Sequence, residues 1–111
     1  MNDDAVGSEP RRYRVDVSDS ADQEADSIFL WMNRNRGPGA AEKWYRGLAA
    51  AFDSLSTFPY RIIAIPGQPE VHRLLHGSYR VLYRVIEPTE PDEVGIVRIL
   101  RVVHGARDSA A

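Results

Sequence analysis

Two arginine residues of this sequence have a spacing that presents both guanidinium groups on one face of a strand, about two strand repeats apart. Arg80 and Arg84 lie four residues apart in the stretch Tyr79–Glu87, whose alternating residues indicate a β-strand. Alternate residues of a strand share a face, so both guanidinium groups point the same way. Arg73, in the stretch Val71–Leu75, is positioned to join them from the neighbouring strand. Guanidinium groups bind phosphate and carboxylate through paired hydrogen bonds, so this cluster favours an anionic partner.

Groups that could transfer a proton are fewer than the cations. His104 is the main candidate, because the ordinary pKa of a histidine lies near neutral pH. Glu70 and His72 are less usual candidates for the same task. His72 and His76 have no metal-ligating neighbours at suitable spacing, so we expect both to be exposed and expect no metal site. The sequence contains no cysteine, which excludes disulfides and thiol catalysis, and no motif indicates a cofactor.

Simpler explanations of these residues remain open. Arg80 and Arg84 are also explained as a solvated strand face, or as partners of acidic residues such as Asp16. The bias toward arginine, with Lys43 as the single lysine, is also explained by a GC-rich genome. His104 is also explained as a turn or surface histidine without a functional role.

The formal net charge of −2 conceals a separation of charges along the chain. Seven of the 16 acidic residues lie in two segments, the leading tail and the stretch Glu87–Glu93, which we interpret as a solvated hairpin tip. The other nine face 14 basic residues, so the rest of the chain carries about five positive charges. Such a balance again favours an acidic partner.

A chain of 111 residues is long enough for one domain with a hydrophobic core but too short for two. We expect a flexible tail over Met1–Pro10 and a single domain over residues 11–108. No apolar run approaches the roughly 20 residues of a membrane-spanning helix, and the acidic start does not read as a secretory signal. We therefore expect a cytoplasmic protein without a membrane partner.

Hydrophobic spacing predicts a strand and two helices in the first half. Arg12–Val17 alternates as a strand, and a helix follows to about Arg34. Ser18-Asp19-Ser20 offers capping side chains for it, with Ser20 and Gln23 as a capping box. Gly37-Pro38-Gly39 separates it from a second helix, which we expect to end at Phe58-Pro59. Five residues form a continuous apolar stripe along that second helix: Ala41, Trp44, Leu48, Ala51 and Leu55. The two helices should pack as an antiparallel hairpin.

Strands fill the second half. We expect a loop over Tyr60–Glu70, strands over Val71–Leu75 and Tyr79–Glu87, and a final strand over Val94–Val103. The final strand is apolar on both faces, so it should be interior to the sheet. Trp44, Tyr79 and Tyr83 lie on apolar stripes and are expected in the core. The order β-α-α-β-β-β predicts an α+β fold with the helical hairpin on one face of a mainly antiparallel, twisted sheet.

Five segments in this order carry a resemblance to a known family. They are Ala40-Ala41-Glu42-Lys43-Trp44, Leu48 to Leu55, Phe58-Pro59, the strand Tyr79-Arg80-Val81-Leu82-Tyr83-Arg84-Val85, and the ending Ile99 to Arg107 with His104-Gly105-Ala106-Arg107. Over residues Arg12 to Asp108 the sequence resembles the RelE/ParE superfamily of toxins from type II toxin–antitoxin pairs.

The resemblance implies a toxin that inhibits bacterial growth and is neutralised in a hetero-oligomer with a cognate antitoxin. RelE-type members cut messenger RNA on the ribosome, whereas ParE-type members act on DNA gyrase. The resemblance places Arg80 at a phosphate-binding position and matches His104 to the terminal histidine of a related branch. RelE-type enzymes carry several lysines, whereas Lys43 is the single lysine here. We expect Arg73, Arg80, Arg84, His104 and Arg107 to contact the target or the antitoxin.

Three functions therefore remain. The resemblance to the ParE branch is closer, because the RelE lysines and terminal tyrosine are missing, and it favours a non-catalytic toxin acting on DNA gyrase. The alternatives are a ribosome-dependent endoribonuclease using Arg80 and His104, and a decayed toxin that only binds its antitoxin. The sequence also leaves open whether Arg98 or Arg101 points to the uncovered face of the sheet, because a one-residue shift in register exchanges them.

Overall fold

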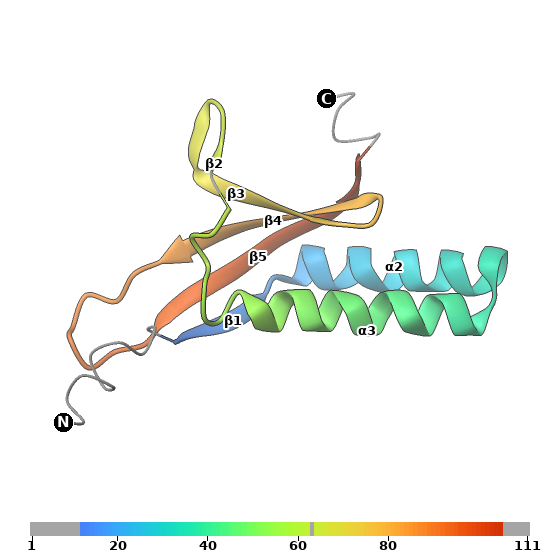
Figure 1. The fold of residues 1–111 in the computed structure, drawn as a ribbon, viewed down its shortest axis with the longest axis horizontal. Helices are drawn as coiled ribbons and strands as arrows, with labels where there is room; N and C mark the ends of the chain where they lie inside the picture. The colour runs from blue at the N-terminus through green and yellow to red at the C-terminus, as the bar shows by residue number, and fades with distance from the viewer. Residues whose placement is uncertain (1–11, 63, 106–111) are drawn as a thin grey trace.

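The computed structural model describes residues 12–62 and 64–105, which form two helices and five strands in two layers (Figure 1). The sheet order is β1-β5-β4-β3-β2, with β1 parallel to β5 and the other neighbours antiparallel. This architecture confirms the predicted α+β fold with a helical hairpin on one face. The predicted tail Met1–Pro10 and the predicted end at Asp108 lie outside the described residues.

The helical hairpin is formed by α2 (Asp19–Arg36) and α3 (Pro38–Ser54). Ser18 is the N-cap of α2, and its hydroxyl accepts the Ala21 backbone N–H at 3.1 Å. The predicted capping box at Ser20 is therefore wrong by two positions, since the hydroxyl nearest the strand takes the role. Gly37 links the helices with φ 96°, which glycine adopts without steric cost.

The apolar stripe of α3 is confirmed. Ala41, Leu48 and Leu55 are at most 2% exposed, and Trp44 and Ala51 pack partly buried against the same core. The helix ends at Ser54, earlier than the predicted end at Phe58-Pro59. A short turn follows it, closed by backbone bonds such as Leu55 N–H to Phe52 O, and Phe58 is 57% exposed.

Part of the predicted loop Tyr60–Glu70 is strand. β2 (Ala64–Ile65) and the start of β3 (Gln68–His76) form a small hairpin through Pro66 and Gly67. Pro66 and Gly67 make its turn, where Gly67 has φ 84°, whereas Pro69 lies within β3. The predicted strand Val71–Leu75 is thus the inner part of a longer strand.

The two remaining strands are β4 (Tyr79–Ile86) and β5 (Gly95–His104), and β1 (Tyr13–Val17) lies on the far side of β5. The helix-facing side of the sheet forms the core. Its completely buried members are Val81, Tyr83, Val97 and Ile99, with Val102 at 1% exposure. Tyr83 is a core residue as predicted, and its hydroxyl donates to Pro59 O at 2.7 Å.

A β-bulge interrupts β5 and decides the orientation of its arginines. Arg98 pairs with Arg84, but Arg101 pairs with Leu82 while Ile99 pairs with Tyr83, so Leu100 is an extra residue in β5. Because Leu82 and Arg84 both lie on the side away from the helices, Arg98 and Arg101 both have register positions on that side. Residues of β5 alternate between the two faces of the sheet only as far as the bulge, so Arg98 and Arg101 do not lie on opposite faces as the sequence suggested.

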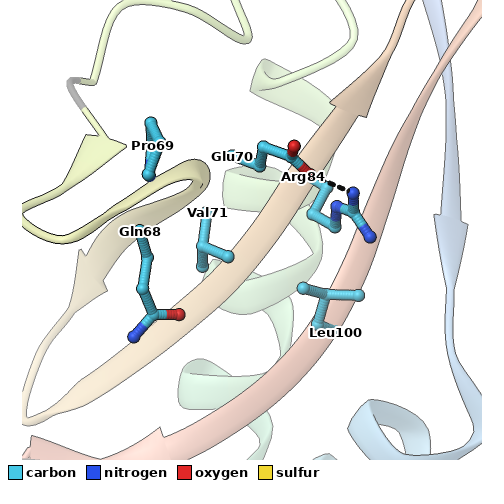
Figure 2. Close-up of a pocket in the computed structure, with 6 residues that line it drawn as sticks. All are labelled: Gln68, Pro69, Glu70, Val71, Arg84 and Leu100. Atoms are coloured by element: carbon cyan, nitrogen blue, oxygen red, sulfur yellow. Dashed lines mark hydrogen bonds and ion pairs between the residues drawn. The ribbon is translucent and has the colours of Figure 1, made fainter.

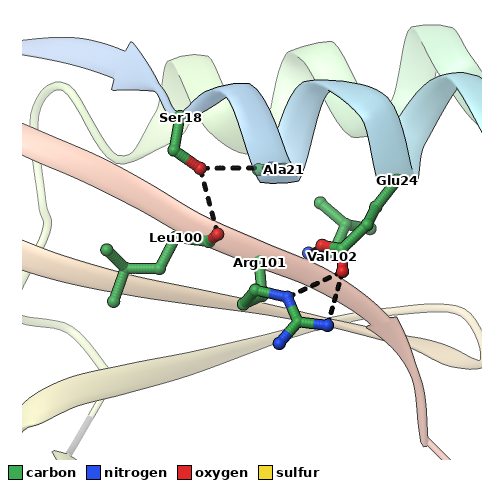
Figure 3. Close-up of polar contacts among 6 residues, drawn as sticks. All are labelled: Ser18, Ala21, Glu24, Leu100, Arg101 and Val102. Atoms are coloured by element: carbon green, nitrogen blue, oxygen red, sulfur yellow. Dashed lines mark hydrogen bonds and ion pairs between the residues drawn. The ribbon is translucent and has the colours of Figure 1, made fainter.

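The first turns of α2 cover the edge of β5 at this bulge (Figure 3). Ser18 donates its hydroxyl to Leu100 O, and the Glu24 carboxylate accepts the Val102 backbone N–H at 2.8 Å and the Arg101 Nε–H at 2.6 Å. β1 stops pairing at Ile99, so these side chains satisfy the backbone groups of β5 that lack a strand partner. The junction therefore ties the helical hairpin to the sheet.

Neither α2 nor α3 combines the length and the apolar character needed to cross a membrane.

Candidate functional site

The side of the sheet away from the helices is here called the open face. Its register positions alternate with the buried residues on each strand. They carry basic and aliphatic side chains: Arg14 and Asp16 on β1; Ile96, Arg98, Leu100, Arg101 and Val103 on β5; Arg80, Leu82, Arg84 and Ile86 on β4; Val71, Arg73 and Leu75 on β3. Leu75 is 65% and Ile86 43% exposed, so apolar surface reaches solvent here.

Four charged residues form what we call the carboxylate–arginine row: Arg84, Arg98 and Asp16 at open-face positions, and Glu70, which reaches Arg84 from the start of β3. Arg84 and Arg98 are direct cross-strand partners, so like charges lie side by side. Each is held by a carboxylate on its outer side: Arg84 Nη2 contacts Glu70 Oε1, and Arg98 Nη2 lies 2.9 Å from Asp16 Oδ2. The Nε of Arg98 is buried and, within the described residues, has no hydrogen-bond partner.

A shallow hollow of about 380 Å³, largely open to solvent, lies beside this row (Figure 2). Val71 and Leu100 supply the aliphatic floor of the hollow. Its rim is completed by the β3 residues Gln68 to Glu70 and by the Arg84 side chain. Leu100 reaches this place because it is the extra residue of the bulge in β5. The hollow therefore combines an apolar floor with an ion pair at its rim.

The three predicted arginines of the β3–β4 hairpin all take positions on the open face. Arg73 pairs across strands with Leu82, and Arg80 pairs with Leu75 on one side and Val103 on the other. The alternative that Asp16 pairs with Arg80 or Arg84 is not what the structure shows, since Asp16 contacts Arg98. Arg107 lies outside the described residues.

His104 lies on the opposite side of the sheet from Arg80. It is the cross-strand partner of Tyr79, and the two rings meet edge to face with centroids 5.2 Å apart. Tyr79 in turn packs against Trp44 of α3 at 5.4 Å, which fixes this side as the helix-facing one. The two candidate catalytic residues are therefore neighbours along the sheet but point away from each other.

The prediction that His72 and His76 are exposed is wrong. His72 is 9% exposed, stacks on Tyr83 at 5.2 Å, and donates its Nδ1–H to Ile62 O at 2.8 Å. His76 is half-buried, and its Nε2–H donates to Trp44 O at 3.2 Å. Ile62 lies 10 residues from His72, and Trp44 lies 32 residues from His76, so the local sequence pattern did not indicate either hydrogen bond. Glu70 and His72 also point to different partners, so they do not form an acid–base pair.

Glu87 is exposed, in line with the predicted solvated tip at Glu87–Glu93, but it also has hydrogen-bond partners that the prediction did not include. Glu87 accepts hydrogen bonds from the hydroxyls of Tyr13, at 2.9 Å, and of Tyr60. Burial and then the Glu87 carboxylate raise the pKa of the Tyr60 hydroxyl, so Tyr60 stays a donor at physiological pH. This cluster joins three separate segments of the chain, and the spacing of its residues offered no signal for it.

Among residues 12–62 and 64–105, no group of three or more histidine or acidic side chains is arranged to hold a metal ion. The open face instead offers guanidinium groups, aliphatic surface and one hollow. These features suit an extended acidic and apolar protein segment.

Comparison with known proteins decides the family. The model that describes the ParE toxin of the type II toxin–antitoxin system parDE matches residues 15–109, most of the chain. This chain belongs to the ParE toxin family. The membership confirms the resemblance to the RelE/ParE superfamily and its closer relation to the ParE branch.

Solved structures agree with this assignment. The chromosomal ParDE system from P. aeruginosa includes a chain with a TM-score of 0.67 and 17% identity, over 84% of this ParE family member and 96% of that chain. At that identity the likeness shows the fold alone. The RelBE2 toxin–antitoxin complex from Mycobacterium tuberculosis matches with a TM-score of 0.51 and 27% identity, over 84% and 98%. No curated protein sequence matches significantly.

Proposed function

We propose that this ParE family member inhibits bacterial growth by acting on DNA gyrase, and that a cognate antitoxin neutralises it by binding the open face. The protein acts in this proposal as a binding partner and not as an enzyme. Family membership supports the toxin role, and the two similar structures belong to toxin–antitoxin systems, which supports an antitoxin partner.

The observation that carries the choice of target is the separation of Arg80 from His104. Cleavage of RNA by its 2′-hydroxyl needs a base, an acid and cations around one phosphate. Arg80 belongs to the open face, whereas His104 packs on Tyr79 on the helix-facing side. One bound phosphate cannot lie against both, which favours a non-catalytic toxin.

The composition of the open face supports neutralisation by direct contact. Its arginines and aliphatic side chains complement a segment that alternates acidic and apolar residues. Such segments are commonly disordered alone and fold on binding, so one short chain can cover a large surface. We expect the antitoxin complex to melt at a higher temperature than the toxin alone; equal melting temperatures would count against this mode of binding.

A supercoiling and cleavage assay with purified DNA gyrase tests the proposal. We expect loss of supercoiling at stoichiometric toxin, and recovery when the product of the neighbouring antitoxin gene is added first. The Arg46→Gln variant is a suitable control, because Arg46 forms an exposed pair with Glu42 on α3, away from the open face. Unchanged supercoiling at stoichiometric, correctly folded toxin would remove the gyrase target.

A ribosome-dependent endoribonuclease is the second candidate, and the basic open face around Arg80 favours it. Primer extension on translated messages would then show cuts in phase with codons, and Arg80→Ala would abolish them. Harmless expression together with a tight antitoxin complex would instead indicate a decayed toxin. Both outcomes differ clearly from gyrase inhibition.

A further inference from the structure

Two features of the carboxylate–arginine row are not explained by its internal ion pairs. Arg84 and Arg98 lie directly opposite each other on β4 and β5, which is an unfavourable placement for like charges. The Nε–H of Arg98 is buried with no acceptor within the described residues, although donors in such positions are normally bonded. The buried Nε of Arg98 is not accessible to a partner, but both arginine side chains are partly exposed, so an additional acceptor that reached them would relieve the like-charge placement.

The position of Glu70 shows how such an acceptor can enter. Its side chain is 75% exposed. It reaches Arg84 from the start of β3, before His72, where the pairing of β3 with β4 begins. Ion pairs this exposed contribute little to stability, so Glu70 can leave Arg84 at small cost. The hollow floored by Val71 and Leu100 lies directly beside the same guanidinium group.

We propose that the row and the hollow together form a specificity site for the antitoxin. A carboxylate of the antitoxin replaces Glu70 on Arg84 and bridges toward Arg98, while a neighbouring aliphatic side chain of the antitoxin fills the hollow. Glu70 is then a competitor within the toxin itself. It binds Arg84 in the free protein, so an antitoxin carboxylate must bind Arg84 more strongly than Glu70 does. This inference rests on the proposed function, because it takes the cognate antitoxin as the partner.

The chemistry of the site favours a protein over a nucleic acid. Recognition of single-stranded RNA relies on aromatic side chains that stack on bases. The open-face positions of the described strands carry no aromatic residue. Glu70 and Asp16 at the two ends of the row would also repel a continuous phosphate backbone. An extended peptide with one acidic residue next to an aliphatic one meets neither obstacle.

Two pairs of variants test the site. Affinity for the purified cognate antitoxin is measured by titration calorimetry for Arg84→Gln and Glu70→Gln. The matched controls are Arg46→Gln and Glu42→Gln, which break another exposed Arg–Glu pair on α3, distant from the row. Each variant removes the same charge as its control, so effects of net charge cancel. Circular dichroism confirms that all four proteins are folded.

We expect Arg84→Gln to weaken binding by at least about tenfold, as loss of a charge-assisted contact does. Glu70→Gln should strengthen binding by about threefold, because the competitor is gone, and a misfolded variant cannot produce such a gain. Both controls should stay within about twofold of the parent protein.

The other outcomes overturn the inference in different ways. If Glu70→Gln weakens binding as Arg84→Gln does, Glu70 supports the surface and does not compete. If all four variants bind alike, the row is not a contact. If a single-stranded RNA oligonucleotide displaces the antitoxin from the parent protein but not from Arg84→Gln, the row serves nucleic acid. If the parent protein binds no antitoxin, the proposed function itself fails.

Discussion

The Glu24 carboxylate provides the sharpest test of how the helical hairpin is held on the sheet. Its side chain is 25% exposed and accepts two hydrogen bonds from β5, the Val102 backbone N–H at 2.8 Å and the Arg101 guanidinium at 2.6 Å (Figure 3). Val102 is 1% exposed, whereas the Arg101 side chain is 52% exposed. The two bonds should therefore differ in importance.

Glu24→Ala removes both bonds and leaves the Val102 N–H without its acceptor. An unsatisfied buried donor costs about 1–3 kcal/mol, and an exposed ion pair adds about 0.2–1 kcal/mol. We expect a total loss of about 2 kcal/mol in the free energy of unfolding, which corresponds to a fall of roughly 10 °C in melting temperature for a domain of this size. Arg101→Ala should cost less than about 1 kcal/mol, because Glu24 keeps its bond to Val102.

Urea unfolding followed by circular dichroism measures both variants, with Glu24→Gln as the control. The glutamine amide oxygen can still accept the Val102 N–H, so this variant should resemble Arg101→Ala. Hydrogen exchange at the Val102 amide should accelerate in Glu24→Ala but not in Arg101→Ala. If Arg101→Ala proves as costly as Glu24→Ala, the ion pair holds the helix and the argument from the buried N–H is refuted.

Three further predictions concern other parts of the fold. Ser18→Ala removes the N-cap of α2 and should cost about 1 kcal/mol in urea unfolding, whereas Ser18→Asp, which keeps the acceptor, should cost less. Gly47→Ala places a Cβ 2.7 Å from the His76 ring, so it should lower the melting temperature even though alanine favours helices; an increase would show that His76 moves freely. Burial raises the pKa of Tyr83, whose neutral hydroxyl donates to Pro59 O, so stability should fall as pH rises above about 10. Tyr83→Phe should show a smaller alkaline loss of stability, and an unchanged loss would contradict this reasoning.

The sequence predicted the elements whose residues repeat at a regular spacing. The stripe from Ala41 to Leu55 identified the buried face of α3, and the alternation from Tyr79 to Val85 separated the two faces of β4 correctly. These patterns are reliable because each element buries one face against the same core. They also placed Arg80 and Arg84 on one face, which the strand register reproduces.

Features that depend on contacts between separate parts of the chain could not be predicted from the sequence. His72 is buried because Tyr83 from the next strand stacks on it and the Ile62 carbonyl accepts its proton, and neither contact leaves a local pattern. Ser54 ends α3 where the sequence suggested a longer helix, because nothing in the next residues breaks a helix before Pro59. The pairing of Asp16 with Arg98 required knowing that β1 lies parallel beside β5.

The bulge in β5 was the least predictable feature, and the proposed function depends on it most. β5 is apolar on both faces, so an extra residue leaves no mark on its hydrophobic pattern. Without Leu100 as the extra residue, strict alternation from Ile99 would put His104 on the same side as Arg80. With the bulge, Val102 enters the core and His104 turns to Tyr79. A shift of one residue thus separates Arg80 from His104, the two candidate catalytic residues, and this separation is the physical argument behind the proposal of a protein target in place of RNA cleavage.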